Sequence, residues 1–270
     1  MTGKMQSPLI EQSVLTITAS DSCGGTGIQA DLYTFAAFGV HGASVVTAVA
    51  AQNTLGIQAI EAVSDRQIVA QLESVLEDLP VRAIKTGLLP SVAGIGILGD
   101  ILISQEPAIP LVVDPVALSV HGRKLTGTTA FEALCDHLFP LAAVITPSIP
   151  EAAALTGMTI ETLDDMVKAA LMLLEVGPGA VLMKGRQLGG DEITDILLTP
   201  DGVTRFIHPA RPERFHGTGS TLSAGIAANL ALDQSLEESV SQAVDYVQSC
   251  IANSVSPVSG HIGLLGHTAR

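Results

Sequence analysis

Short apolar segments rich in β-branched residues alternate along the chain with segments of helical periodicity. This alternation predicts βαβ units, in which mostly parallel strands form a central sheet and helices cover both of its faces. The expected strands are at 14–18, 43–51, 57–63, 81–84, 111–113, 142–145 and 180–183, and the expected helices at 28–38, 65–79, 91–103, 126–138, 151–156 and 163–176. A hairpin at 191–198 and 203–208, and helices at about 217–232 and 235–253, complete the predicted α/β fold. Segment 43–51 is almost continuously apolar, which is typical of a strand buried on both faces.

The length and apolar content of the chain limit the kind of protein it can be. Its 270 residues, of which 47% are hydrophobic, can bury one large α/β core. Because no linker or internal repeat divides the chain, we expect one domain over 1–270, with 1–12 as a disordered tail. No apolar run reaches the ~18 residues that span a bilayer. The first residues also lack the apolar core of a signal peptide, so we expect a cytoplasmic protein.

The formal net charge of −14 argues against nucleic acid or an anionic membrane as a partner, because both select basic surfaces. A phosphate site in such an acidic chain has to be built locally, from backbone amides and a few placed cations. The cysteines, Cys23, Cys135 and Cys250, lie far apart without metal-ligand spacing, and we expect them to be reduced thiols.

The segment 216–221, with the sequence HGTGST, precedes the first of the two closing helices. Its two glycines allow a sharp backbone turn, and the free N–H groups at a helix start form a site for an anion such as phosphate. The alternative is a glycine turn that merely starts a helix of small residues. The segment alone does not decide between the two.

Polar residues follow nearly every expected strand, and ligands of open α/β sheets bind beyond the carboxyl ends of the strands. These residues are Asp21 with a glycine turn, Gln52 with Asn53, Lys85, Asp114, Ser148 with Glu151, and Lys184. Cations, carboxylates and amides beside an anion turn suit phosphoryl transfer from a nucleotide bound to Mg²⁺. The chain has neither the glycine fingerprint of a dinucleotide-binding fold nor that of a P-loop, so a Rossmann dehydrogenase and a P-loop kinase are disfavoured.

The motifs of the chain, taken together and in order, resemble those of hydroxymethylpyrimidine/phosphomethylpyrimidine kinases. They are ASDSCGGTGIQAD at 19–31, AAQNT at 50–54, IKTGL at 84–88, VDPV at 113–116, ITP at 145–147, PE at 150–151, LMKG at 182–185 and HGTG at 216–219, and the resemblance spans about 14–267. This family of thiamin-synthesis enzymes belongs to the ribokinase-like superfamily and is related to pyridoxal/pyridoxine kinases. The resemblance implies a three-layer α/β/α fold, often dimeric. It also implies transfer of the ATP γ-phosphate to the hydroxymethyl group of a pyrimidine and then to its monophosphate.

The resemblance implies a substrate site made by four residues. Gln52 is placed on the pyrimidine, where one amide can pair with a ring nitrogen and an exocyclic amine; pyridoxal lacks that pairing edge. Asp31 is placed near the substrate hydroxyl, with Gly25 allowing close approach, and Leu88 lines the pocket. The alternatives are a strand-end amide for Gln52, a solvated helix face for Asp31 and core packing for Leu88.

The resemblance also implies a site for ATP. Lys184 is expected to direct its charge at the nucleotide phosphates, and Gly217 and Gly219 to cradle the γ-phosphate. Ser148 and Thr218 are further nucleotide contacts. A merely exposed charge is the alternative for Lys184.

Two carboxylates, Asp114 and Glu151, are expected around Mg²⁺, mostly through water. The alternatives are a turn residue for Asp114 and stabilisation of the first helical turn by Glu151. The sequence leaves open whether a monovalent cation is also needed. Lys85 is expected to be structural and paired with a carboxylate, while His216 either helps to hold a phosphate or is simply exposed.

Three positions depart from the pattern of the family. Ser220 stands where the family has a Cys, which itself replaces the catalytic Asp of other ribokinase-like enzymes. Because a hydroxyl ionises far less readily than a thiol, we expect Ser220 to orient the substrate and catalysis to be slowed rather than abolished. Ser148 replaces an Asn, and Arg186 replaces a Gly, which adds a cation near the phosphates or only a salt bridge. Besides the kinase, the sequence therefore leaves open a pyridoxal kinase and a pyrimidine-binding protein without kinase activity.

Overall fold

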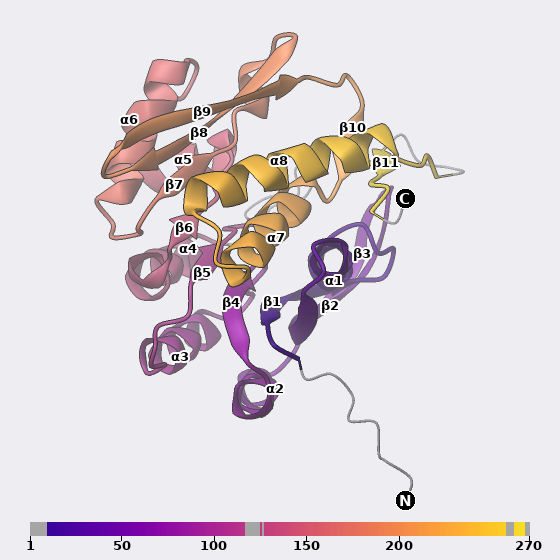
Figure 1. Ribbon diagram of the computed structural model, residues 1–270, viewed down its shortest axis with the longest axis vertical. Coiled ribbons are helices and arrows are strands. Elements are labelled where there is room, and N and C mark those ends of the chain that lie inside the picture. Colours follow the sequence, from indigo (N-terminus) through magenta and orange to yellow (C-terminus); the bar gives the residue numbers. More distant parts are fainter. Residues whose placement is uncertain (1–9, 117–124, 126, 258–261, 268–270) are drawn as a thin grey trace, which may run out of the picture.

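The predicted alternation of strands and helices forms one nine-stranded sheet with helices on both faces (Figure 1). The computed structural model describes residues 10–116, 125, 127–257 and 262–267. Across the sheet the strands are ordered β3 (Gly56–Ala62), β2 (His41–Asn53), β1 (Ser13–Asp21), β4 (Val81–Thr86), β5 (Leu111–Val113), β6 (Val144–Ile145), β7 (Val181–Met183), β8 (Glu192–Thr199) and β9 (Gly202–Pro209). The pairs from β2 to β7 are parallel, whereas β2–β3, β7–β8 and β8–β9 are antiparallel.

Helices cover the sheet in two groups that share no core cluster. One group is α1 (Gly27–Ala37), α7 (Thr218–Ala231) and α8 (Leu236–Ala252). The other is α2 (Asp65–Asp78), α3 (Val92–Ile103), α4 (Thr128–His137), α5 (Ile149–Thr156) and α6 (Leu163–Leu174). The three-layer α/β/α prediction is confirmed, and its reason is visible in β5, where successive side chains point to opposite faces. Val112 packs in the core on the α7 side, and its two neighbours pack in the core on the opposite side.

The sequence predicted that the strand at 43–51 is buried on both faces, but the end of β2 is exposed on one face. Val49 is 54% exposed, and the exposed and buried residues alternate towards Asn53. This is the pattern of an antiparallel pair with one solvated face, which β2 forms here with β3. The run of apolar residues therefore predicted the strand correctly but not its surroundings.

A second, two-stranded sheet was not predicted from the sequence. It pairs β10 (Arg214–His216) in parallel with β11 (Ile262–Leu264), so that His216 lies opposite Leu264. Both strands have three residues, too short for an apolar period to mark them. In Figure 1 they lie beside the β1–α1 connection, at the edge of the sheet where the parallel strands end.

The structure describes only the last residues of the expected N-terminal tail, 1–12. Residues 1–9 of the expected tail lie outside the described residues, and residues 10–12 precede β1 without secondary structure. Within the described part of the chain, none of the helices combines the length and the hydropathy that a bilayer crossing requires.

Candidate functional site

A cavity of about 480 Å³ lies beyond the carboxyl ends of the parallel strands, at the sheet edge where the sequence predicts the ligand site. Its walls come from β1, β2 and β3, from the segments after β4, β5, β6 and β7, and from β10 and the start of α7. The sequence-predicted residues that line it are Gln52, Leu88, Asp114, Ser148, Glu151, Lys184, Gly217, Thr218, Gly219 and Ser220. Asp31 and Gly25 are not among the lining residues.

The start of α7 is built as an anion site. Gly217 precedes the helix with φ of 92°, a left-handed conformation that favours glycine. The first helical hydrogen bond runs from the Thr221 N–H to the Gly217 carbonyl, so the amides of Thr218, Gly219 and Ser220 come before the helical ladder. A Cβ on Gly217 would lie 1.8 Å from the carbonyl oxygen of Gly25, which excludes any larger residue. Three backbone amides and the positive end of a 14-residue helix therefore face the cavity.

Lys184 lies directly against this helix start. Its Nζ donates to Asp114 Oδ1 at 3.1 Å and lies 3.9 Å from Glu151 Oε2. Burial alone would lower the pKa of Lys184, but attraction to these two carboxylates outweighs burial and raises the pKa. A Cβ on Gly219 would be 3.4 Å from the Nζ atom, so the charge sits beside the α7 amides. A permanently charged lysine at an anion site suits phosphate binding.

The two predicted metal carboxylates converge on Lys184 but differ in their other contacts. Asp114 also accepts from Thr146 Oγ1 at 3.3 Å and Ser223 Oγ at 3.5 Å. Glu151 Oε2 accepts from both N–H and Oγ of Ser148 at 2.7 Å, which caps the start of α5. The helix-stabilising alternative for Glu151 is therefore present in the structure. Carboxylate and hydroxyl oxygens are the donors that Mg²⁺ prefers, so the donor set fits that ion.

Asp31 corrects the sequence prediction. Its side chain is fully buried, and Oδ2 accepts from Lys85 Nζ at 2.7 Å and from Thr16 Oγ1. Burial raises the pKa of Asp31 in spite of the attraction of Lys85. The placement of Asp31 at the substrate hydroxyl is wrong, because α1 turns this residue towards β4 and not into the cavity. The expectation that Lys85 is structural and paired with a carboxylate is confirmed.

Gly25 permits a close approach, but the group that approaches is part of the protein. A Cβ at this position would lie 2.3 Å from Cδ2 of His216 and 2.9 Å from Cδ2 of Leu264. The role of Gly25 at the substrate is therefore corrected: it makes room for the His216 ring. The next residues of the same turn, Thr26 and Gly27, do line the cavity.

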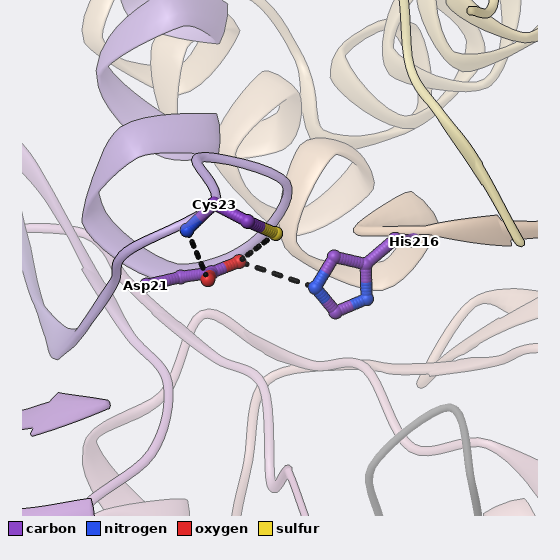
Figure 2. A group of neighbouring side chains, drawn as sticks. All are labelled: Asp21, Cys23 and His216. Atoms are coloured by element: carbon purple, nitrogen blue, oxygen red, sulfur yellow. Dashed lines mark hydrogen bonds and ion pairs between the residues drawn. The ribbon is translucent and has the colours of Figure 1, made fainter. Parts of the chain in front are cut away.

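The sequence places Asp21, with its glycine turn, among the polar residues at the edge of the sheet but assigns it no role in the site. Figure 2 shows the Asp21 carboxylate in contact with both Cys23 and His216. Oδ2 accepts from Gly25 N–H at 3.1 Å and Thr26 N–H at 2.9 Å, and Oδ1 accepts from Cys23 N–H at 2.9 Å. Burial alone would raise the pKa of the Asp21 carboxyl, but hydrogen bonds from His216, Cys23 and Thr26 outweigh burial and lower the pKa to about 2.

The same three side chains are the one group of candidate metal ligands in the described ranges, with ligand atoms within 4.8 Å of one another. Their chemistry does not fit a metal ion. Burial raises the pKa of the Cys23 thiol to about 11, whereas a metal needs the thiolate. The oxygen of Asp21 nearest to the other two is already engaged by backbone amides. The cluster is therefore a hydrogen-bonded anchor of the glycine turn.

His216 is 4% exposed, so the exposed alternative is wrong. Its Nε2 lies 3.1 Å from Asp21 Oδ2 and 2.7 Å from Nε2 of the Gln52 side-chain amide. Gln52 is on β2 and Lys184 follows β7, five places further across the sheet, so the two lie at opposite ends of the cavity. The apolar Ile57, which lies opposite Gln52 on β3, and Ile60 also line the cavity at the Gln52 end. One end of the cavity thus presents an amide beside apolar side chains, and the other presents amides, a cation and carboxylates.

Arg186 also lines the cavity. Its guanidinium donates to the carbonyl of Glu213 at 2.7 Å and to that of Arg211 at 3.3 Å, in the segment before β10. Arg186 therefore places a further cation at the Lys184 end of the cavity, where backbone carbonyls rather than a carboxylate hold its guanidinium.

An anion-binding helix start, a charged lysine and two carboxylates at the carboxyl edge of a three-layer α/β/α sheet define a phosphotransferase of the ribokinase-like class. The family model described as "Phosphomethylpyrimidine kinase" matches residues 21–264. The chain belongs to the phosphomethylpyrimidine kinase family.

Individual relatives agree with this assignment. The chain is 39% identical over 262 residues to hydroxymethylpyrimidine/phosphomethylpyrimidine kinase of Streptomyces coelicolor, covering 96% of each chain. It resembles the crystal structure of phosphomethylpyrimidine kinase from Clostridium difficile with a TM-score of 0.79 at 41% identity, over 88% of this chain and 99% of that one. It also resembles the ADP complex of Bacillus subtilis pyridoxal kinase with a TM-score of 0.88 at 31% identity, over 96% of this chain and 98% of that one.

Proposed function

We propose that this kinase transfers the γ-phosphate of ATP to the hydroxymethyl group of 4-amino-5-hydroxymethyl-2-methylpyrimidine and then to the monophosphate formed. The observation that carries the proposal is the polarity of one cavity, with the Gln52 amide at its apolar end and the α7 amides with Lys184 at the other. The relatives named above are hydroxymethylpyrimidine/phosphomethylpyrimidine and pyridoxal kinases. Their names support a cavity that binds a ring at one end and the phosphates of ATP at the other.

Each end of the cavity has its own part in the transfer. Gln52 pairs with the ring, and Leu88 packs against it. The amides of Thr218, Gly219 and Ser220, in the turn opened by Gly217, receive the γ-phosphate, and Lys184 neutralises the charge that develops on its equatorial oxygens. The hydroxymethyl oxygen attacks phosphorus as the bond to the bridging oxygen of ADP breaks, and the hydroxyl proton then passes to water. In the second step a phosphate oxygen of the monophosphate is the nucleophile.

Asp114 and Glu151, with Ser148 beside them, would hold Mg²⁺ through water at the Lys184 end. When bound, that ion supplies charge neutralisation at the β- and γ-phosphates. A loose transition state asks the protein for positioning and charge more than for early removal of the proton. Ser220 then suffices to orient the hydroxyl at the start of α7.

Substituting Ser220 with cysteine is expected to raise kcat by up to about 10²-fold, the lower end of what a general base contributes. The reason is that a thiolate at a helix start can accept the hydroxyl proton, whereas a serine hydroxyl does not. Steady-state kcat with the pyrimidine and with its monophosphate measures the effect. Ser220→Ala is the matched control and is expected to lie below the wild type. Equal kcat for Ser220→Cys and Ser220→Ala would contradict a role at the reacting hydroxyl.

The test of the function is ADP release from ATP and Mg²⁺ with the pyrimidine, its monophosphate and pyridoxal as separate acceptors. Pyridoxal is the second candidate because the fold matches a pyridoxal kinase with a TM-score of 0.88. Preferred turnover of pyridoxal would overturn the substrate assignment. Tight pyrimidine binding without turnover, in the wild type and in Ser220→Cys, would instead indicate a binding protein.

We further propose a homodimer in the cytoplasm. Val49 and Leu55, at the β2–β3 hairpin, are 54% and 58% exposed, and such apolar residues support an interface between two copies. Cys23, Cys135 and Cys250 are free thiols, in line with a reducing compartment. Sedimentation equilibrium is expected to give twice the chain mass for the wild type and a lower mass for Val49→Asp/Leu55→Asp. A monomeric wild type would contradict the dimer.

A further inference from the structure

The substrate end of the cavity is organised by the contacts of His216. Four segments meet at its ring: the turn after β1, the end of β2, β10 and β11. A Cβ at Gly25 would lie 2.3 Å from the ring, and β11 packs the Leu264 side chain beside the same glycine. His216 Nε2 faces two atoms, Asp21 Oδ2 at 3.1 Å and Gln52 Nε2 at 2.7 Å. The imidazole therefore connects an anchored carboxylate to the amide that faces the substrate.

The surroundings of His216 decide which ring nitrogen carries the proton. Asp21, whose low pKa keeps it ionised at neutral pH, can only accept a hydrogen bond from Nε2. Nδ1 is buried and has no hydrogen-bond partner among the residues that the structure describes. A buried acceptor without a partner costs less than a buried N–H without one. Both observations favour the tautomer with the proton on Nε2.

A proton on Nε2 decides the orientation of Gln52 as well. The two ends of a primary amide have the same shape, so a half turn presents either the oxygen or the NH₂ group to His216. In the structure the nitrogen of this amide, Gln52 Nε2, lies 2.7 Å from His216 Nε2. When both nitrogens carry hydrogen neither can accept, so the half turn that brings the oxygen to this position is required. The NH₂ group also donates to Thr26 Oγ1, but at 3.5 Å this hydrogen bond is too weak to keep the NH₂ group facing His216. We infer that His216, held by Asp21, is a positioning residue that turns the Gln52 oxygen towards itself and leaves the Gln52 NH₂ group for the substrate ring.

The orientation of the Gln52 amide determines which class of substrate ring can bind. This inference rests on the proposed function. The NH₂ group of Gln52 donates to a ring nitrogen, and the second lone pair of its oxygen accepts from an exocyclic amine. A 4-aminopyrimidine meets both requirements. A 4-oxopyrimidine reverses them, because its ring N–H faces the NH₂ group and its carbonyl faces the oxygen. If the Gln52 amide turned over to suit the oxo ring, its NH₂ group would face the Nε2–H of His216, and two donors cannot form a hydrogen bond. His216 thus makes the pocket selective for amino over oxo rings.

The test compares binding of 4-amino-5-hydroxymethyl-2-methylpyrimidine and its 4-oxo counterpart by calorimetry, without ATP. The wild type is expected to prefer the amino ring by on the order of 10²-fold or more, the penalty for two mismatched polar pairs. His216→Phe keeps a ring beside Gly25 but has no donor, so the preference is expected to fall below about tenfold. His216→Gln, which can still donate to Asp21 and Gln52, is expected to retain most of it. His41→Phe, at the exposed start of β2, is the matched control and is expected to keep the full preference.

Outcomes separate this inference from the proposed function. If the wild type binds the amino ring and His216→Phe prefers the amino over the oxo ring as strongly as the wild type does, the inference is overturned and the proposed function stands. If the wild type binds neither pyrimidine, the proposed function fails and the inference fails with it. A measurement that needs no variant is the ¹⁵N spectrum of labelled histidine in the wild type. The Nε2–H tautomer of His216 is the expected result, and the Nδ1–H tautomer would overturn the inference.

Discussion

Replacing Lys184 with methionine is expected to lower kcat by about 10²–10³-fold, the loss seen when one group that stabilises developing charge is removed. Methionine keeps the length of the side chain and removes its charge. Lys184 Nζ lies beside the α7 amides and 3.1 Å from Asp114, so its charge is at the phosphate end of the cavity. Pyrimidine affinity is expected to be unchanged, because Gln52 is at the opposite end. Steady-state kinetics at saturating ATP, together with calorimetry of the pyrimidine, measures both quantities.

The same substitution is expected to destabilise the fold, because Asp114 and Glu151 are buried and lose their cation. Removing one partner of a buried ion pair typically costs about 3–5 kcal/mol in the free energy of unfolding. Lys168→Met, on the exposed face of α6, is the matched control and is expected to change neither kcat nor stability appreciably. A kcat of Lys184→Met within tenfold of the wild type would show that Lys184 does not act on the transferred phosphate.

Replacing Asp31 with alanine is expected to lower the free energy of unfolding by about 3–5 kcal/mol, because the charge of Lys85 is left buried without its carboxylate. The two side chains are 0% and 1% exposed, so water cannot take the place of the lost partner. Urea unfolding measures the loss. Arg82→Ala, which breaks the exposed Arg82–Asp233 pair, is the matched control, with an expected effect of about 0–1 kcal/mol.

A double variant separates a structural Asp31 from one that contacts the substrate. Asp31→Leu with Lys85→Met replaces the pair by apolar residues of similar size, and most of the lost stability is expected to return. KM for the pyrimidine is expected to match the wild type in this variant. A stable double variant whose KM is raised about tenfold would restore Asp31 to the substrate site and contradict the buried pair.

The sequence predicted the parts of the site that follow from local rules. Strand ends in a parallel sheet meet at one edge, so Lys184, Asp114 and Gln52 could be assigned to a common cavity before any coordinates were known. A glycine pair before a helix predicted the anion turn at Gly217 and Gly219 because backbone conformation and helix dipole are local properties. Lys85 was expected to pair with a carboxylate, and it does.

Predictions failed where a side chain takes its partner from a distant segment. Asp31 has the position of a helix residue after a glycine turn, but its partner Lys85 lies 54 residues away on β4. His216 meets Gln52, which lies 164 residues away, only because β10 pairs with β11 and Gly25 leaves space for the ring. No periodicity marks strands of three residues, so the sequence did not show that His216 is buried.

By itself, the sequence determined the α/β/α layering, the edge of the sheet that carries the site and the glycine turn that opens α7. Each of these depends on apolar period, strand direction or backbone freedom, which neighbouring residues establish. Only the tertiary structure decided which polar side chains face the cavity and which are buried in ion pairs. The reason is that burying a charge or a polar ring is tolerated only with a partner, and that partner comes from whichever distant element packs against it.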